Sequence, residues 1–226
     1  MSAVPTSISV IVPVHNGARF VSDALRSVKS QTLPADEIIV VDDGSSDGSA
    51  DIVLREHPDA VLIRQPRAGV AAARNAGARR ARCEALAFLD RDDLWLPERN
   101  AALLHAWRAN PEADVICGAF RVLVEPGASD DERLRRAEGS DAPFLVRTFM
   151  IRRPCWLALG GMQSERDYAE DLDLYLRLIE AGVNILRIDA ATLIYRMHGA
   201  NHSRAAARNS GALLSTLRAA IQRRRA

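Results

Sequence analysis

The chain has 226 residues, of which 48% are hydrophobic and 26% charged, as in an ordinary soluble protein large enough to bury one sizeable core. A formal net charge of +1 excludes a general electrostatic attraction to nucleic acid, so no nucleic-acid partner is expected. Three widely spaced cysteines indicate no disulfide framework, and the lack of a signal peptide or of roughly 18 consecutive apolar residues predicts a cytoplasmic protein.

The first predicted elements are a strand, a loop and a helix. The strand covers residues 8–13 and is rich in β-branched side chains; it is expected to stop at Pro13, which cannot donate to a sheet ladder. The loop Val14-His15-Asn16-Gly17 follows. Apolar residues at helical spacing then predict an amphipathic helix over residues 20–32.

A second apolar strand, residues 37–41, runs directly into the acidic loop of residues 42–47. Asp47 is the predicted N-cap of a helix over residues 49–55, and residues 60–63 form a short third strand. The alternation of apolar strands with helices predicts an α/β fold with a parallel sheet and right-handed crossovers.

A run of helix-forming residues follows, Gly69–Ala78, and its small side chains would let it approach another backbone closely. Arg74 lies within this run. An arginine on such a helix usually lies on a solvent-exposed face or forms a salt bridge. For Arg74 the alternative is that it contacts a phosphate or a nucleotide.

The clearest chemical signal is the stretch Ala85–Trp95, where an apolar strand runs into Asp90, Asp92 and Asp93. In open α/β sheets the carboxyl ends of the strands face the ligand crevice, so these carboxylates are expected there, together with Asp43. Three crowded carboxylates repel one another, and a hard cation such as Mg²⁺ or Mn²⁺ explains them most easily. The alternative is a solvated acidic turn that caps the next helix.

The middle of the chain predicts a helix from Pro97 to Asn110 and a strand from Val115 to Val124. Residues 125–142 are charged and turn-rich, which is typical of a substrate-selecting loop and equally of a tolerated insertion. Apolar structure resumes over residues 144–151, and Gly160-Gly161 predicts a tight turn or helix exit.

Another amphipathic helix is predicted over residues 169–179, with Glu170, Asp171 and Asp173 in its first turn. The helix dipole by itself favours carboxylates at this position, so they require no catalytic explanation.

The last part of the chain predicts two short strands, residues 184–189 and 192–195, and a loop with His198 and His202. A lone loop histidine is usually exposed. The tail forms a helix whose apolar face consists of Leu213, Leu214, Leu217 and Ile221. This helix could pack on its own domain, or dock on a partner or on an acidic membrane surface, which would place the protein peripherally at the inner face of the membrane.

Five short motifs follow one another on this scaffold: Pro13-Val14-His15-Asn16, Asp42-Asp43-Gly44-Ser45-Ser46-Asp47, Ala73-Arg74-Asn75, Phe88-Leu89-Asp90-Arg91-Asp92-Asp93 and Glu170-Asp171. Together they resemble the inverting glycosyltransferases of family 2. The resemblance implies the GT-A fold, a Rossmann-like, mostly parallel sheet flanked by helices, as a single domain over residues 7–203. Residues 204–226 remain outside it as a basic amphipathic C-terminal helix.

The resemblance implies that the loop after the first strand and the acidic loop of residues 42–47 bind a nucleotide-sugar donor. Pro13, Val14, His15 and Asn16 would line the base and the ribose. Asp43 would accept a hydrogen bond from the base.

The resemblance also assigns the diphosphate and metal contacts. Arg74, Asp90 and Asp92 would contact the donor. Asp92 and Asp93 would hold a divalent metal, Mg²⁺ or Mn²⁺, and His198 would be a further metal or diphosphate contact. Which of the three aspartates binds the ion stays open.

The Glu170-Asp171 pair resembles the family's catalytic pair, in which Asp171 would be the general base that deprotonates an acceptor hydroxyl. Inversion by in-line attack needs one such base, and a cation can stabilise the charge on the departing diphosphate. The resemblance implies metal-dependent transfer of a sugar from a UDP-sugar or other nucleotide-diphosphate sugar to an acceptor hydroxyl. The acceptor would be a saccharide or a lipid-linked molecule. The product would be a cell-surface polysaccharide or another glycoconjugate.

Three other functions agree less well with the sequence. A dinucleotide-dependent dehydrogenase is disfavoured because the first strand does not lead into G-x-G-x-x-G. A sugar nucleotidyltransferase would be expected to have a glycine-rich, basic phosphate loop after the first strand, which is absent. A non-catalytic nucleotide-sugar-binding partner subunit is disfavoured because Asp171 and the metal acids are retained.

Overall fold

The computed structural model describes residues 4–128, 145–163, 169–199 and 206–223. The strands are β1 (Ile8–Val14), β2 (Glu37–Asp43), β3 (Val61–Gln65), β4 (Ala85–Phe88), β5 (Leu94–Trp95), β6 (Val115–Val124), β7 (Phe149–Arg152) and β8 (Ile185–Met197). The helices are α1 (Val21–Lys29), α2 (Ser49–Glu56), α3 (Val70–Arg80), α4 (Arg99–Ala109), the 3₁₀ turn η1 (Val146–Thr148), α6 (Arg153–Ala158), α7 (Glu170–Glu180) and α8 (Ala206–Arg223).

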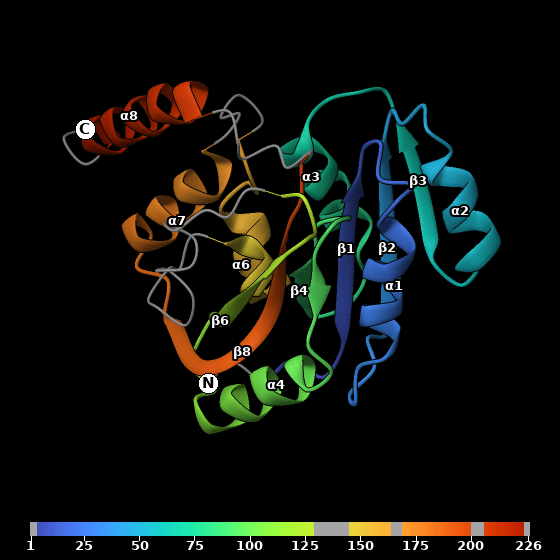
Figure 1. The fold of residues 1–226 in the computed structure, drawn as a ribbon. Helices are drawn as coiled ribbons and strands as arrows, with labels where there is room; N and C mark the ends of the chain where they lie inside the picture. Colours follow the sequence, from blue (N-terminus) through green and yellow to red (C-terminus); the bar gives the residue numbers. More distant parts are fainter. Residues whose placement is uncertain (1–3, 129–144, 164–168, 200–205, 224–226) are drawn as a thin grey trace.

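All of these strands belong to one sheet, in the order β3-β2-β1-β4-β7-β6-β8-β5. Figure 1 labels β1, β2, β3, β4, β6 and β8. The first four are parallel to one another, and β6 is parallel to β8. Strands β7 and β5 run antiparallel to the strands they pair with. The predicted α/β fold with a mostly parallel sheet is therefore confirmed, with two antiparallel strands inserted in its second half.

Helices cover both faces of the sheet, because successive strand residues point to opposite sides. In β1, Val10 and Val12 belong to a hydrophobic cluster that includes residues of α1, α2 and α4, whereas Ile11 belongs to a second cluster with residues of α3, α6 and α7. Both sets are buried, which explains why these strands appear in the sequence as continuous apolar runs. The same alternation places Asp42 and Asp43, adjacent in β2, on opposite faces of the sheet.

The prediction that the first strand stops at Pro13 is wrong, since β1 continues to Val14 and Pro13 pairs with Val41 of β2. The carbonyl of Ile11 accepts a hydrogen bond from Leu89, on the β4 side. Pro13 lies two residues further and faces the same side, but β4 has already ended at Phe88. The N–H that proline lacks would have had no partner there, so proline is tolerated.

The two predicted short strands near the end of the chain form one continuous strand, β8. Asp189 and Ala190, at the predicted break, are exposed. The pairing with β6 continues past them through a register shift, from Cys117 opposite Arg187 to Ala119 opposite Ala191. An irregularity of this kind absorbs extra residues in one strand and lets the ladder go on.

The N-cap of α2 is Gly48, with φ +83°, and not Asp47 as predicted. The Asp47 carboxylate nevertheless accepts the backbone N–H of Ser49 at 3.0 Å and that of Ala18 at 2.9 Å. Asp47 thus ties the start of α2 to the loop after β1.

Several smaller expectations can also be compared with the structure. Gly160 and Gly161 both have positive φ and form the predicted exit from a helix, α6. The three cysteines are free. Residues 129–142 of the charged segment lie outside the described residues. His202 also lies outside them. None of the described helices combines the length and the apolar character needed to cross a membrane.

Candidate functional site

The three aspartates after β4 form a compact acidic turn. Leu89 is the last residue bonded to β1, and the N–H of Asp93 donates to the carbonyl of Asp90 at 3.2 Å. One carboxylate oxygen from each of Asp90, Asp92 and Asp93 lies within 4.8 Å of the others. Asp92 and Asp93 are buried. Such a cluster is neutralised by a cation, by basic side chains or by protonation.

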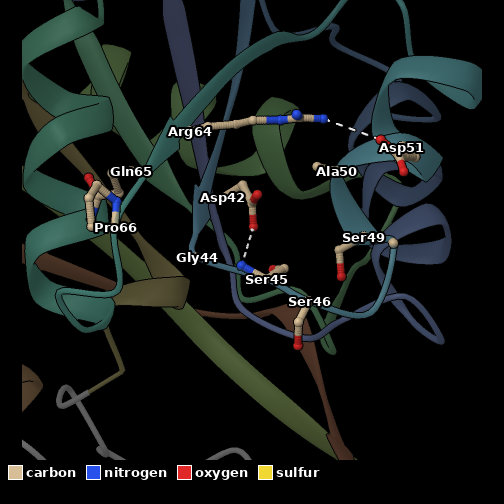
Figure 2. Close-up of a pocket in the computed structure, with 11 residues that line it drawn as sticks. Asp42, Gly44, Ser45, Ser46, Ser49, Ala50, Asp51, Arg64, Gln65 and Pro66 are labelled. Atoms are coloured by element: carbon tan, nitrogen blue, oxygen red, sulfur yellow. Dashed lines mark hydrogen bonds and ion pairs between the residues drawn. The ribbon is translucent and has the colours of Figure 1, made fainter.

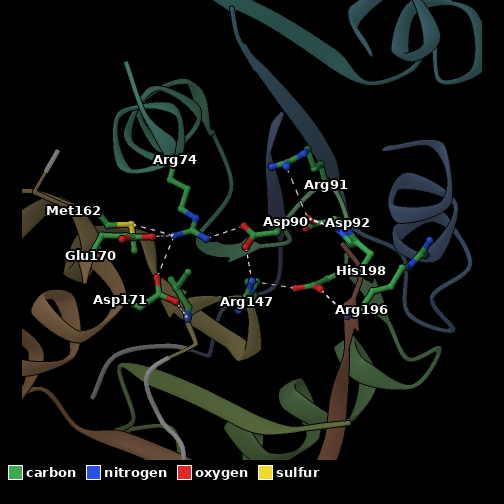
Figure 3. Close-up of polar contacts among 12 residues, drawn as sticks. Arg74, Asp90, Arg91, Asp92, Arg147, Met162, Glu170, Asp171, Arg196 and His198 are labelled. Atoms are coloured by element: carbon green, nitrogen blue, oxygen red, sulfur yellow. Dashed lines mark hydrogen bonds and ion pairs between the residues drawn. The ribbon is translucent and has the colours of Figure 1, made fainter. Parts of the chain in front are cut away.

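Two arginines bind Asp90, the buried Arg74 and the half-buried Arg147 (Figure 3). Nη2 of Arg74 donates to Oδ1 at 2.7 Å, and Nη1 of Arg147 donates to Oδ2 at 2.6 Å. Burial alone would raise the pKa of Asp90, but the two guanidinium groups outweigh it and hold the pKa below its ordinary value. Asp90 is therefore a neutralised anion with both oxygens in use.

Asp93 is bound in a similar way, with a side chain only 1% exposed. Its Oδ1 accepts the N–H of Arg196 at 3.0 Å, and its Oδ2 lies 3.2 Å from Nη1 of Arg147. Burial raises the pKa of Asp93 to about 8, and the charge of Arg147 opposes this rise. Arg147 also lies over the ring of Tyr195, 4.9 Å from its centroid.

Asp92 has different partners: Nε2 of His198 lies 3.1 Å from its Oδ2, and Nη2 of Arg91 lies 3.8 Å from the same oxygen. His198 follows β8 and is 3% exposed, contrary to the expectation for a loop histidine. Its ring packs on Phe20 at the start of α1, with 4.4 Å between centroids. Among the three aspartates, Asp92 is thus the one that neither Arg74 nor Arg147 binds.

Asp171, at the start of α7, is joined to the acidic turn by Arg74 (Figure 3). Nη1 of Arg74 donates to Oδ1 of Asp171 at 3.1 Å and lies 4.0 Å from Oε1 of Glu170. Oδ2 of Asp171 accepts the N–H of Val146 at 3.3 Å. One guanidinium therefore connects the predicted base with Asp90.

The carboxylates of α7 differ in their surroundings. Burial raises the pKa of Asp171, although Arg74 opposes the rise. Burial and the neighbouring charge of Asp171 raise the pKa of Glu170 to about 7. Asp173 is fully buried, and its Oδ2 lies 2.7 Å from Nε of Arg177 on the same helix, so its role is structural.

The five residues Asp90, Asp93, Asp171, Arg74 and Arg147 are called the acid–arginine network below. It draws on β4, α3, α7 and η1, which are far apart in sequence. The neighbouring Asn75 has a structural role: its side chain donates to the carbonyl of Met162 at 2.7 Å and accepts the N–H of Met162 at 2.9 Å. This fixes the turn that leads toward α7.

The loops after β1 and β2 are joined to each other. The N–H of Asn16, which has φ +50°, donates to Oγ of Ser45 at 3.0 Å, and its Oδ1 accepts the N–H of Ser46 at 2.9 Å. Nδ1 of His15 lies 2.9 Å from the carbonyl oxygen of Asp43. Asparagine tolerates positive φ better than other side chains, which suits it to this turn.

Asp43 holds the start of α3. Its Oδ1 accepts hydrogen bonds from Nε2 of Gln65 and the N–H of Ala68, and its Oδ2 accepts the N–H of Gly69, each at 2.8 Å. A carboxylate offers about four acceptor positions, so roughly one remains. Asp43 shares no hydrogen-bond or ion-pair partner with Asp90, Asp92 or Asp93, and within the described residues these form two groups.

A cavity of about 550 Å³ lies beside these loops, within the size range of small-molecule sites (Figure 2). Its lining comes from the loop after β2, the first turn of α2 and the end of β3. Asp42 and Arg64 line it, whereas Asp43 does not. Oδ1 of Asp42 accepts the N–H of Ser45, which shapes the loop at the rim.

The sequence did not predict the roles of Arg147 and Phe20. Arg147 interrupts an otherwise apolar stretch, residues 144–151, and a charged residue in such a run is a signal for a buried ion pair. Phe20 was expected only to contribute to the apolar face of its helix. Nothing local in the sequence connects it with His198.

Comparison with known proteins places the chain in a family. Residues 9–163 match the family model described as glycosyl transferase family 2. An uncharacterised glycosyltransferase of Haemophilus influenzae is 28% identical over 185 residues, which cover 76% of this chain and 62% of that protein. One from Rickettsia typhi is 27% identical over 208 residues, covering 85% and 64%. The chain thus spans less than two thirds of these relatives.

Solved structures show the same fold. A mannosyltransferase, PcManGT of Pyrobaculum calidifontis in complex with GDP-Man and Mn²⁺, superposes with a TM-score of 0.73 at 22% identity, covering 97% of this chain and 67% of that one. Residues 1–349 of S. aureus TarS in complex with UDP-GlcNAc give 0.71 at 20% identity, covering 88% and 61%. By its sequence match over more than half of its length, the chain belongs to glycosyl transferase family 2.

Proposed function

We propose that the chain catalyses metal-dependent, inverting transfer of a sugar from a nucleotide-diphosphate donor to an acceptor hydroxyl. The observation that carries this proposal is the position of Arg74, whose two Nη atoms bind Asp171 and Asp90. Inverting transfer needs a base at the acceptor and positive charge at the departing diphosphate. The network holds a candidate base and the acidic turn within the reach of one guanidinium.

The donor set of the acidic turn fits a divalent cation. Asp92 and His198 supply an oxygen and a nitrogen 3.1 Å apart, and imidazole with carboxylate suits Mn²⁺ better than Mg²⁺. Asp90 is neutralised by arginines, and Asp93 can join the set if Arg147 shifts. When bound, the cation would stabilise the negative charge of the diphosphate as a Lewis acid.

Asp171 is the proposed general base, which takes the proton of the acceptor hydroxyl. Arg74 and the N–H of Val146 orient its carboxylate. Arg74 also favours the ionised form that a base requires, against the effect of burial. Glu170 is the alternative base, since a pKa of about 7 also suits proton transfer at neutral pH.

The joined loops after β1 and β2 are the proposed surface for the nucleotide. His15 and Asn16 would line its base and ribose, supported from behind by Pro13 and Val14 at the buried end of β1. Asp43 would use its remaining acceptor position for the base. Solved proteins of similar fold bind UDP, UDP-GlcNAc and GDP-Man, which supports a nucleotide-diphosphate sugar as the donor class. The proposed acceptor is a saccharide or a lipid-linked molecule, and the proposed catalytic domain is residues 7–203.

The test is to incubate the protein with UDP- and GDP-sugars and Mn²⁺, with and without glycan and lipid-linked acceptors, and to measure nucleoside diphosphate release. Acceptor-dependent release is expected, and NMR of the product should show an inverted anomeric configuration. Release of pyrophosphate would instead identify a sugar nucleotidyltransferase. Donor binding without any release for the whole acceptor set would identify a non-catalytic subunit.

A further inference from the structure

Helix α8 exposes an apolar stripe. Leu213, Leu217 and Ile221 follow one another at spacings of four residues, and Leu214 lies beside them. Their exposed fractions are 42%, 44%, 52% and, for Leu214, 58%. In Figure 1, α8 lies at the periphery of the molecule, next to α7. Four large apolar side chains on one exposed stripe require an explanation.

Packing on the rest of the chain does not explain these exposed apolar side chains, because α8 packs on the chain with a different face. Thr216 and Ala220, also four residues apart, are buried. Nε of Arg223 lies 2.7 Å from Oε2 of Glu180, at the end of α7. The helix is thus fixed to α7, and the apolar stripe is turned outward.

Positive charge accompanies the stripe. The sequence of α8 contains no Asp or Glu, and Arg224 and Arg225 follow it. Arg218 follows Leu217 directly, is exposed, and has no carboxylate of the described residues within ion-pair distance. Two copies of the chain that met through this stripe would bring arginines of like charge together, which disfavours self-association.

We propose that α8 docks on an anionic membrane surface. Its four apolar side chains would enter the boundary between headgroups and acyl chains, and Arg218 would lie at the level of the lipid phosphates. An amphipathic helix with an apolar stripe flanked by arginines binds such surfaces through these two contributions. This inference goes beyond the proposed sugar transfer and does not depend on it.

The test is co-sedimentation of the full chain with vesicles of phosphatidylcholine alone or mixed with phosphatidylserine. We expect binding only to the mixed vesicles, with affinity that falls as salt is added. The double variant Leu214→Gln/Leu217→Gln should bind at least about tenfold more weakly, since it removes two of the inserted side chains. The matched control is Leu54→Gln/Leu157→Gln, because these leucines are 52% and 44% exposed on α2 and α6. The control should bind normally.

A charge variant tests the second contribution. Arg218→Glu should weaken binding to mixed vesicles by roughly fivefold or more, as expected for loss of one basic residue near the surface. All three variants change exposed residues, so their thermal melting curves should remain close to that of the parent. The proposal is overturned if the parent does not sediment with mixed vesicles, or if the α8 and control variants lose equal affinity. A dimer in light scattering that only the α8 variant abolishes, without vesicle binding, would assign the stripe to a second copy.

Discussion

At the scale of single residues, Arg74 is the link between the two halves of the proposed chemistry. It binds Asp171 on one side and Asp90 on the other while it is itself 2% exposed. A buried guanidinium between two carboxylates fixes their separation and their charge. The two acids are therefore held in place before any substrate binds.

The first prediction concerns the base. Asp171→Asn keeps the shape of the side chain and removes proton acceptance, so transfer should fall by about 10²–10⁴ while donor affinity changes little. Transfer rates together with calorimetry of donor binding would measure both. The role belongs to Glu170 instead if Asp171→Asn retains transfer within a few-fold and Glu170→Gln abolishes it.

The second prediction concerns Glu170 and pH. Its pKa of about 7 in the folded protein exceeds the ordinary 4.5, so between these values the folded protein keeps a proton that the unfolded chain releases. The free energy of unfolding contributed by this group therefore falls as pH rises through this window, by up to roughly 3 kcal/mol. Relative to the parent, Glu170→Gln should gain stability between pH 4.5 and pH 8, as measured by urea unfolding. An equal difference at both pH values would contradict the assignment.

The third prediction concerns Arg147, which binds Asp90 and Asp93. Arg147→Met fills a similar space but leaves the half-buried Asp90 and the buried Asp93 without this partner, which should cost about 1–3 kcal/mol of stability while Arg74 still binds Asp90. Arg147→Lys keeps the charge and should lose less. Urea unfolding of both variants would show this order. Equal losses would mean that the side chain acts by packing on Tyr195 and not by its charge.

At the scale of elements, the close approach of α3 to the sheet depends on a glycine. A Cβ at Gly77 would lie 2.5 Å from Cγ2 of Ile11 in β1 and 3.3 Å from Cγ2 of Val41 in β2. These distances are too short for a packed core without movement of the helix. The small residues of α3 are thus what brings Arg74, on the same helix, to the edge of the sheet.

The fourth prediction follows from this contact. Gly77→Ala should destabilise the protein by about 1–3 kcal/mol, because overpacking outweighs the better helix propensity of alanine. Gly211→Ala in α8 is the matched control, since a Cβ there would meet no atom within 4 Å. That variant should be neutral or stabilised by up to about 1 kcal/mol. Thermal unfolding of the pair would decide, and a stabilised Gly77→Ala would refute the packing argument.

At the scale of the whole molecule, the proposed donor and cation should bind together. The diphosphate is an anion beside an acidic turn, so its binding requires the cation to offset the repulsion. The fifth prediction is that UDP or GDP raises the melting temperature only when Mn²⁺ is present, and that a chelator removes the shift.

Two variants make this measurement specific. Asp92→Asn should abolish the Mn²⁺-dependent shift, because Asp92 faces His198 and is not bound by Arg74 or Arg147. Asp93→Asn should retain most of the shift, since Arg147 and Arg196 already bind that side chain. The opposite order would make Asp93 the main ligand.

The sequence by itself determined the α/β fold and the edge of the sheet at which the acids gather. Apolar runs that end in Asp43 and Asp90 are local signals, since a strand buried on both faces must be apolar and the polar residues after it mark its end. Parallel pairing of β2 and β4 with β1 then aligns their carboxyl ends.

Only the tertiary structure decided which partners these acids have. Arg147 and His198 reach the acidic turn because β7 and β8 join the sheet out of sequence order, and nothing local encodes that order. The tertiary structure also decides that the apolar stripe on α8 faces outward. Helical periodicity shows that Leu213 and Leu217 share a face of the helix. Which face packs on α7 depends on contacts between distant elements, such as the ion pair with Glu180. Periodicity is a property of neighbouring residues, whereas ion pairs between distant elements depend on the completed fold.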